Sequence, residues 1–228
     1  MHEIEKTNCF HFRYNALMQI QLDGKWVTAE LGETILQAAQ REGIDIPTLC
    51  HVPNVKPSSH SCLVCLVKLN GRFVPSCAIT AEEGMVIESE TDEVHAMRRA
   101  ALELLLSDHM GHCRTCGDGR KKCRLLKCIA KYRVHRQRYG TVDMPENDMP
   151  ENIVQSDLII FDSRKCIKCG ICIAIAKQHN EDIGLAFFGR GWETHIGIPF
   201  DEPLHGAIEQ SANDIIPACP TAALTWRR

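Results

Sequence analysis

The cysteines constrain this chain more than any other feature. Thirteen of its 228 residues are cysteine, and eleven of these fall into three groups that each contain a Cys-x2-Cys spacing. A secreted disulfide scaffold is usually shorter and holds an even number of cysteines. Closely spaced thiols in a reducing compartment more often bind metal or carry out redox chemistry. The sequence therefore predicts a metal or redox protein.

The first group lies in a segment that has the pattern of a small β-grasp domain, residues 16–90. Asp23-Gly24 and Asn70-Gly71 each stand between two strand-like runs, which is a strong signal for a β-hairpin. A short helix is expected over 34–42, and a closing strand is expected near Ser89. Two hairpins and one helix within so few residues indicate an α+β fold of the β-grasp type.

Four cysteines in this domain are separated by eleven, two and eleven residues: Cys50, Cys62, Cys65 and Cys77. The second hairpin brings the last three to one end, and the loop after the helix supplies the first. Four thiolates are the ligand set of a 2Fe-2S cluster. The alternative is a structural zinc site, although zinc ribbons usually carry two Cys-x2-Cys knuckles and only one is present here.

A small helical domain is expected over residues 91–140. A helix over 92–107, with Thr91 as its N-cap, is followed by a cysteine-rich loop over 108–123 and a basic helix that runs to about Tyr139. The expected apolar stripe of the first helix consists of Val94, Met97, Ala101, Leu104 and Leu105.

The candidate ligands of this middle group are His109, Cys113, Cys116 and Cys123, which predict a 4Fe-4S cluster. Cys128 and His112 compete for the fourth position. If Cys123 begins the basic helix, Cys128 lies about 140° further around the helix axis and points away from the cluster, which favours His109. Because a histidine ligand is neutral, it raises the reduction potential of a cluster relative to a thiolate.

The last group is Cys166, Cys169, Cys172 and Cys219, with Pro220 after the final cysteine. Cys-x2-Cys-x2-Cys with a distant Cys-Pro is the bacterial ferredoxin pattern. The fourth cysteine of the first ferredoxin motif is replaced by Ala176. The first three of the second motif are replaced by Glu209, Ala212 and Ile215. All ligands of one cluster are thus absent and all of the other are kept, so residues 156–228 are expected to form a ferredoxin-like domain with one 4Fe-4S cluster.

The remaining segments carry less information. Residues 1–15 are expected to be an extension, and residues 141–155, with a tandem proline-containing repeat, are expected to be a linker. Cys9 and Cys128 are left over as ordinary thiols.

Charge and motifs narrow the function classes further. A net charge of −3 is that of an ordinary soluble surface, and no apolar run is long enough to span a bilayer. The N-terminus lacks a secretory signal, so the protein is expected in the cytoplasm. No Gly-x-Gly-x-x-Gly after a strand, P-loop, catalytic triad or flavin site is evident. The basic stretch over 120–138 is assigned to a solvated or subunit-docking helix face in preference to nucleic-acid binding.

The three groups, in this order, resemble the N-terminal segment of the large iron–sulfur subunit of respiratory complex I. They are equally similar to the diaphorase small subunit of NAD-reducing hydrogenases and to the front of electron-bifurcating iron-only hydrogenases. The resemblance covers about residues 17–228 and is most specific in the first cysteine set, in the His109-x3-Cys113-x2-Cys116 loop and in CIKCGIC at 166–172. The chain departs from the family pattern by having six residues, where five are usual, between Cys116 and Cys123.

The resemblance implies an electron-relay subunit with no catalytic residues of its own, in a hydrogenase, transhydrogenase or formate dehydrogenase type of NAD(P)-linked complex that is soluble and in some relatives bifurcates electrons. FMN and NAD are expected on a partner subunit only, with a further redox subunit as the second partner. No nucleic acid and no direct membrane insertion are expected. The catalytic domains of larger relatives are not found before Arg228, so the redox endpoints are expected on other chains. The alternatives are a free-standing ferredoxin-like carrier and a zinc-stabilised interaction protein.

Overall fold

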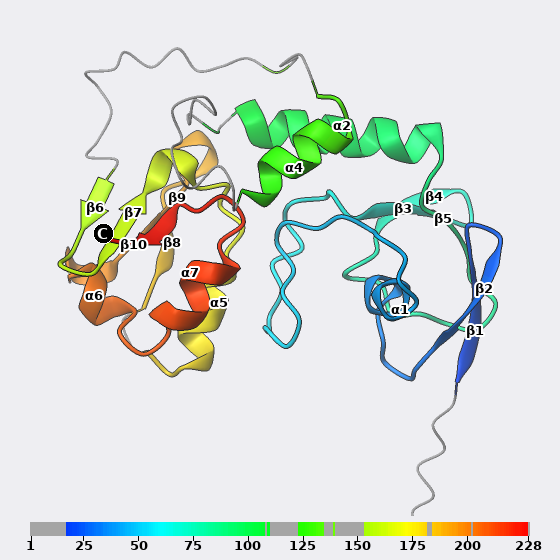
Figure 1. Ribbon diagram of the computed structural model, residues 1–228, viewed down its shortest axis with the longest axis horizontal. Helices are drawn as coiled ribbons and strands as arrows, with labels where there is room; N and C mark the ends of the chain where they lie inside the picture. Colours follow the sequence, from blue (N-terminus) through cyan, green and yellow to red (C-terminus); the bar gives the residue numbers. More distant parts are fainter. Residues whose placement is uncertain are drawn as a thin grey trace, which may run out of the picture.

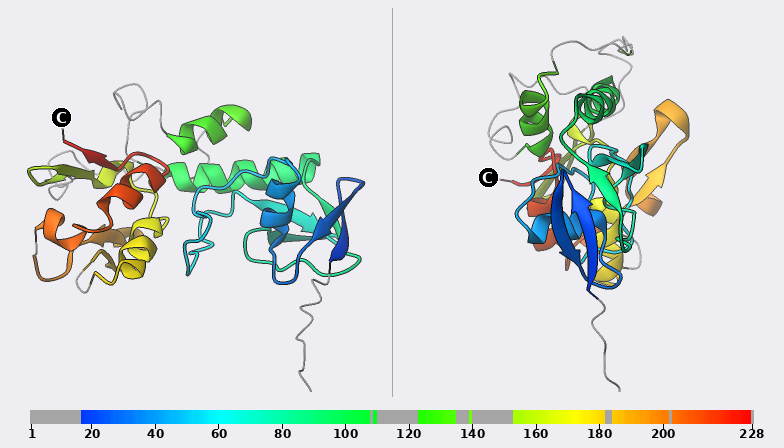
Figure 2. Two further views of the ribbon diagram at one scale, coloured as in Figure 1. Left: turned by 60° about the horizontal axis from the view of Figure 1, so that its bottom comes forward. Right: turned by 90° about the vertical axis from the view of Figure 1, so that its right-hand side faces the viewer.

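A computed structural model describes residues 17–107, 109, 123–134, 139, 153–181, 184–201 and 203–227. These residues form two packed parts, one around the N-terminal sheet and one around the C-terminal strands and helices (Figure 1). Helix α2 (Asp92–Ser107) extends from the first part toward the second, and the views in Figure 2 show the same arrangement from two other sides. The helix therefore links the two parts that carry the first and last cysteine groups.

The first part is a mixed five-stranded sheet in the order β2-β1-β5-β3-β4. Its strands are β1 (Met18–Leu22), β2 (Lys25–Ala29), β3 (Leu66–Leu69), β4 (Arg72–Pro75) and β5 (Val86–Glu88). The pairs β1–β2 and β3–β4 are antiparallel hairpins, while β1 and β5 run parallel in the middle. Two hairpins joined through a central parallel pair, with a helix against the sheet, fit the expected β-grasp arrangement.

Both predicted hairpin turns are confirmed by their backbone angles. Asp23 and Gly24 have φ values of 49° and 78°, and Asn70 and Gly71 have values of 48° and 84°. Positive φ at both central residues is typical of type I′ turns, whose twist matches that of the flanking strands. Asparagine, aspartate and glycine adopt this conformation more readily than other residues, so the two dipeptides determine where the strands reverse.

The two helices of this region begin at polar caps. Helix α1 (Ile35–Arg41) starts with a reciprocal capping box in which the Thr34 hydroxyl accepts from the backbone of Gln37 and the Gln37 side chain accepts from the backbone of Thr34. Helix α2 has the predicted bounds, and the Thr91 hydroxyl accepts a hydrogen bond from the Val94 amide at 3.3 Å. The caps satisfy amides that have no partner within the helix.

The predicted apolar stripe of α2 is only partly its buried face. Val94 and Ala101 are buried, but Met97 and Leu104 are 39% and 52% exposed. Arg98 is instead fully buried. Its guanidinium donates to the Leu66 carbonyl and the Tyr132 hydroxyl in the interior, so the buried face of the helix includes position 98.

Helix α4 (Arg124–Lys131) is shorter than predicted and ends well before Tyr139. Arg133 has a φ of 51°, in the left-handed region, and the Val134 amide donates to the Ile129 carbonyl at 3.0 Å. This six-to-one hydrogen bond is that of a Schellman motif, which terminates a helix. The run of basic residues predicted a longer helix because composition carries no information on the left-handed residue that terminates it.

The second part combines a three-stranded sheet, in the order β10-β7-β6, with a small hairpin and three helices. The strands are β6 (Ile153–Gln155), β7 (Ile159–Asp162), β8 (Ala186–Phe188), β9 (His195–Gly197) and β10 (Leu224–Trp226). The α-helices are α5 (Ile171–Gln178), α6 (Leu204–Ala207) and α7 (Ala212–Ala218), and the 3-10 turns are η2 (Ser163–Lys165), η3 (Gly191–Glu193) and η4 (Pro199–Asp201). Strand β6 occupies the last residues of the segment expected to be a linker, because they pair with β7.

Two apolar cores underlie this arrangement. One fills the space between the first sheet and α1, with Ile20, Leu22 and Ile35 fully buried. The other runs from α2 and α4 through the second part, and includes Leu102 and Ile215. The cysteine groups lie in and between these cores.

Within the described stretches, no helix combines the length and the apolar character needed to cross a lipid bilayer.

Candidate metal centres

The first cysteine group converges at one end of the first sheet. Cys50 follows the loop after α1, Cys62 and Cys65 lie just before β3, and Cys77 follows β4. All four are at most 3% exposed. Cys62 and Cys65 both lie in the turn that enters β3, whose first residue is Leu66.

The four sulfur atoms of this group form one connected row. Cys50 hydrogen-bonds with both Cys62 and Cys77, and the Sγ atoms of Cys65 and Cys77 are 3.3 Å apart. Among the described residues, no three His, Cys, Asp or Glu side chains surround a point that could hold a single metal ion. Four thiolates in a row match the demand of a 2Fe-2S cluster, in which two irons share four cysteines.

Hydrogen bonds inside the row separate the pKa values of its thiols. Hydrogen bonds from Cys62, the larger influence, and from Cys77 lower the pKa of Cys50 to about 2, and the hydrogen bond from Cys77 lowers the pKa of Cys65 to about 7. The hydrogen bond to Cys50 raises the pKa of Cys62. The hydrogen bonds to Cys50, the larger influence, and to Cys65 raise the pKa of Cys77. The hydrogen bonds from Cys62 and Cys77 thus favour the thiolate form of Cys50, and thiolates are the metal-binding form of cysteine.

Two residues of the loop between Cys50 and Cys62 touch this row and were not singled out in the sequence. Nδ1 of His60 lies 3.2 Å from Sγ of Cys77. The Ser59 hydroxyl lies in hydrogen-bond contact with Cys50. Their position in a loop bounded by two ligands is the only sequence signal that points to them.

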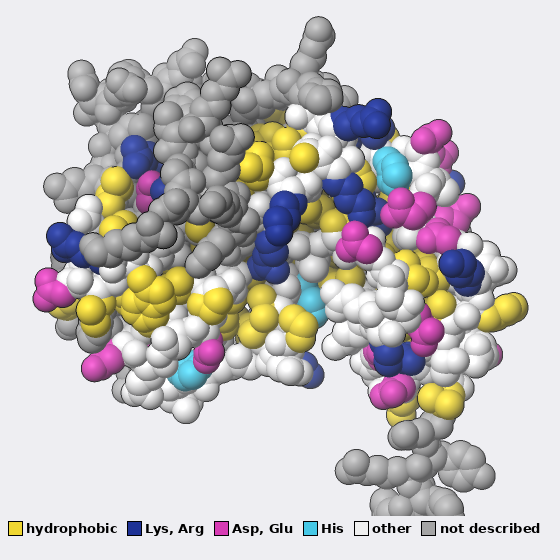
Figure 3. Space-filling view, viewed as in Figure 1, with side chains coloured by type: hydrophobic (Ala, Val, Ile, Leu, Met, Phe, Trp, Pro, Cys, Tyr) yellow, Lys and Arg dark blue, Asp and Glu magenta, His cyan; other side chains and the backbone are white. Residues whose placement is uncertain are grey.

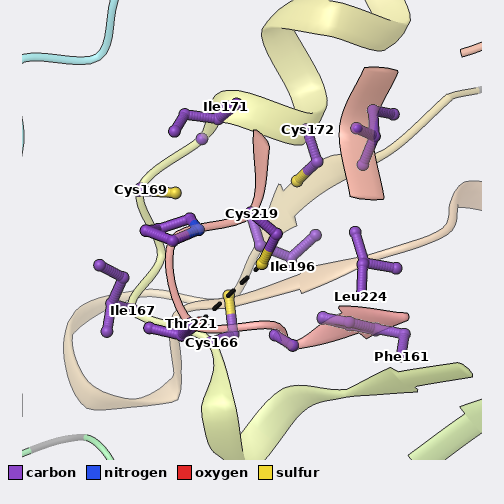
Figure 4. A pocket seen from close by; sticks show the side chains of 14 residues that line it. Phe161, Cys166, Ile167, Cys169, Ile171, Cys172, Ile196, Cys219, Thr221 and Leu224 are labelled. Atoms are coloured by element: carbon purple, nitrogen blue, oxygen red, sulfur yellow. Dashed lines mark hydrogen bonds between the residues drawn. The ribbon is translucent and has the colours of Figure 1, made fainter. Parts of the chain in front are cut away.

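The last cysteine group lines a small apolar cavity in the second part. Cys166 follows η2, Cys169 precedes α5, Cys172 is on its first turn, and Cys219 ends α7. Figure 4 shows the four sulfur atoms turned toward one common space, with Ile196 and Leu224 among the surrounding apolar side chains. The expected ligands are therefore brought together, at the corners of a cavity.

Backbone amides point at these sulfurs, as the helix start allows. The Lys168 amide donates to Cys166 Sγ at 3.3 Å, and the Ile171 and Ile173 amides donate to Cys169 and Cys172. Burial nevertheless dominates, and it raises the pKa of Cys169 to about 12 and raises that of Cys172 as well. Binding iron here must release thiol protons, and the amides then stabilise the thiolates.

The middle group is described only in part. Cys123 is the N-cap of α4, as predicted, and its Sγ accepts from the Leu126 amide at 3.4 Å. The His109 amide donates to the Leu106 carbonyl just after α2. Cys128 is buried in the core, where burial raises the pKa of its thiol. The other members, His112, Cys113 and Cys116, lie outside the described residues.

The first and last sites are joined by direct contacts. The Ser59 hydroxyl, beside Cys50, donates to the carbonyl of Cys169 at 2.5 Å. In the same loop, the Asn54 carbonyl accepts from the Gln178 side chain of α5 at 2.9 Å. A segment bounded by two first-site ligands therefore packs directly on a last-site ligand.

Comparisons with known proteins agree with this geometry. Residues 15–92 match the family described as "2Fe-2S iron-sulfur cluster binding domain". The chain is 30% identical over 217 residues to the NADP-reducing hydrogenase subunit HndD of Solidesulfovibrio fructosivorans, with 92% of this chain and 36% of that protein covered. It therefore spans only about a third of that relative's length.

Two further comparisons cover most of both chains. The NAD-reducing hydrogenase HoxS subunit gamma of Cupriavidus necator is 28% identical, over 92% of this chain and 88% of that protein. A crystal structure of an NAD+-reducing [NiFe]-hydrogenase in the H2-reduced state contains a chain that is 26% identical, with a TM-score of 0.79, covering 92% of this chain and 87% of the other.

Proposed function

We propose that this chain is an iron–sulfur electron-transfer subunit that relays single electrons through one 2Fe-2S and two 4Fe-4S clusters. It does so between a flavin- and NAD-binding subunit and a further redox subunit. Its match to the 2Fe-2S cluster binding domain and its similarity to hydrogenase and NADH-quinone oxidoreductase subunits support the proposal. The clusters supply one-electron chemistry with little ligand movement. This chain's own residues hold the clusters, space them and exclude water.

The ligand assignment keeps the three sets of the sequence. Cys50, Cys62, Cys65 and Cys77 hold the 2Fe-2S cluster; His109, Cys113, Cys116 and Cys123 hold the middle 4Fe-4S cluster; Cys166, Cys169, Cys172 and Cys219 hold the last one. The row of sulfurs in the first set and the cavity-lining sulfurs in the last support this division.

The contact of Ser59 with both Cys50 and Cys169 is the observation that carries the relay. A metal site that only stabilised its own domain would not need to touch the ligand of another site. Here one side chain connects ligands that are 119 residues apart in the chain (169 minus 50). We infer that electrons pass directly between the first and last clusters along this contact.

Anaerobic purification with iron and acid-labile sulfide assays tests the proposal. The expected result is visible absorbance and about ten irons and ten sulfides per chain, from one 2Fe-2S and two 4Fe-4S clusters. A colourless protein that contains zinc would contradict it.

A second measurement tests the partner. NADH alone is expected to leave the visible absorbance unchanged, because flavin and nicotinamide are assigned to another subunit, and NADH with the co-purified flavoprotein is expected to bleach it. Bleaching by NADH without a flavoprotein would contradict the assignment of the flavin. Recovery of the chain from native cells without any flavoprotein would favour the free-standing carrier.

A further inference from the structure

Among the described residues, Arg98 is the largest polar side chain that is fully buried. It lies in the middle of α2 and has no exposed surface. An arginine is rarely buried completely unless its charge has partners. The fully buried guanidinium therefore requires hydrogen-bond acceptors and a compensating charge in the interior.

The guanidinium connects two of the cluster-binding regions. Its Nε donates to the Leu66 carbonyl at 3.0 Å, and Leu66 directly follows the ligand Cys65. Its Nη1 donates to the Tyr132 hydroxyl at 2.8 Å. Tyr132 caps the C-terminal end of α4, the helix that begins after the middle-site ligand Cys123.

The positive charge of Arg98 is only partly compensated. Its carboxylate partner among the described residues, Glu90, accepts from Nη1 at 3.5 Å, and half of the Glu90 side chain is exposed to solvent, which weakens the effect of its charge. Nη2 is buried and has no hydrogen-bond partner among the described residues. The other cation near Tyr132, Lys131, is itself paired with Asp45. Because Glu90 is half-exposed, it offsets only part of the charge of the fully buried guanidinium, and electrostatic effects in a low-dielectric interior reach further than in water.

We propose that Arg98 is a positioning and potential-setting residue of the first cluster site: it fixes the start of β3 beside Cys65, and its partly uncompensated charge raises the reduction potential there. A buried cation stabilises the added electron of the reduced state, so the site becomes a better acceptor. The inference rests on the proposed 2Fe-2S cluster in that site.

The test is an EPR-monitored redox titration of the purified full chain. In Arg98→Met, the ratio of reduced to oxidised cluster at the wild-type midpoint is expected to fall about tenfold, which corresponds to about 59 mV for one electron. Arg98→Lys keeps the charge and is expected to recover at least half of that shift. Arg99→Met removes a charge from the adjacent, half-buried position and is the matched control, with a smaller shift expected.

Two outcomes would overturn the inference: equal shifts in the Met and Lys variants, which would indicate a packing role only, or equal shifts at positions 98 and 99. If the Arg98 variants do not bind iron, Glu90→Gln is compared with Glu93→Gln, which removes a nearby carboxylate that pairs with Lys68 instead of Arg98. The inference requires a larger rise in potential at position 90, and fails without it. A wild-type chain with no 2Fe-2S signal would instead contradict the proposed function.

Discussion

The first and last cysteine sites solve the same chemical problem with different geometry. In the first, the four sulfurs touch one another in a row, and hydrogen bonds between them spread their pKa values apart. In the last, the four sulfurs face an apolar cavity from separate corners, and burial is the main influence on the thiols.

The proposed cluster types would account for this difference through the number of irons that share the ligands. Two irons with four thiolates take two each, so the sulfurs must be close in pairs, whereas four irons take one thiolate each and the sulfurs stand apart around the cluster. The surrounding elements match: a hairpin end places ligands close together, and two helix ends with a buried cavity place them apart. The spacing of sulfurs is thus informative about cluster type where both sets have four cysteines.

Single-ligand variants offer the most direct way to break this comparison. Cys172→Ser is expected to lose about four of about ten irons and to keep the 2Fe-2S signal, while Cys65→Ser is expected to lose about two irons and that signal. Iron analysis and EPR of anaerobically purified protein measure both. Equal iron losses in the two variants would contradict the assigned difference in cluster type.

The middle site shows whether the comparison extends to a third geometry. His109→Ala is expected to remove about four irons, and Cys128→Ala, which changes a buried cysteine of the same region, is expected to retain them. His109→Cys is expected to keep the iron and lower the potential of that cluster, because a thiolate carries a negative charge. Iron loss in the Cys128 variant with none in the His109 variant would reverse the ligand assignment.

Gly170 tests how strictly the last site depends on its helix start. Its φ is 72°, and an added Cβ would lie 3.4 Å from the Phe187 ring and 3.5 Å from the Ser59 Cβ. Gly170→Ala is expected to lower the free energy of unfolding by about 1–2 kcal/mol because of the left-handed backbone. Gly206→Ala, where a Cβ meets nothing within 4 Å and φ is not in that region, is the control. Denaturant unfolding compares them, and similar losses would argue against the backbone explanation.

The smallest expected effect concerns the contact between the two sites. Ser59→Ala removes the hydroxyl that donates to the Cys169 carbonyl, and it is expected to cost about 1 kcal/mol. Hydrogen exchange of the loop amides is expected to become faster, and the magnetic interaction between the first and last clusters in EPR is expected to weaken. Ser58→Ala removes a neighbouring hydroxyl that has no hydrogen-bond partner among the described residues, and it should change neither. Unchanged spectra in both variants would remove Ser59 from the electron route.

Local signals in the sequence predicted much of the first part. Asp-Gly and Asn-Gly specify type I′ turns through their own backbone preferences, and Thr91 specifies a helix start through its hydroxyl. The pairing of cysteines into sites also followed from spacing, because a hairpin and a helix start have known reach. These features depend on neighbours in the chain.

The sequence could not predict the features that depend on distant partners. Arg98 looks like a surface residue until the Leu66 carbonyl and the Tyr132 hydroxyl are placed beside it. Ser59 gains its role only from Cys169, which is 110 positions away. The early end of α4 depends on Arg133 accepting a left-handed conformation, which no pattern of basic residues reveals. Tertiary contacts decide these cases.

The ligands of the first site belong to two different cores. Cys65 and Cys77 pack with the sheet and α1, whereas Cys50 and Cys62 pack with the interior that extends into the second part. A cluster bound by all four ligands would therefore cross-link two apolar cores that are otherwise separate. Removal of iron from that site should then weaken the packing between the two parts of the molecule, so that insertion of the cluster is coupled to completion of the tertiary structure.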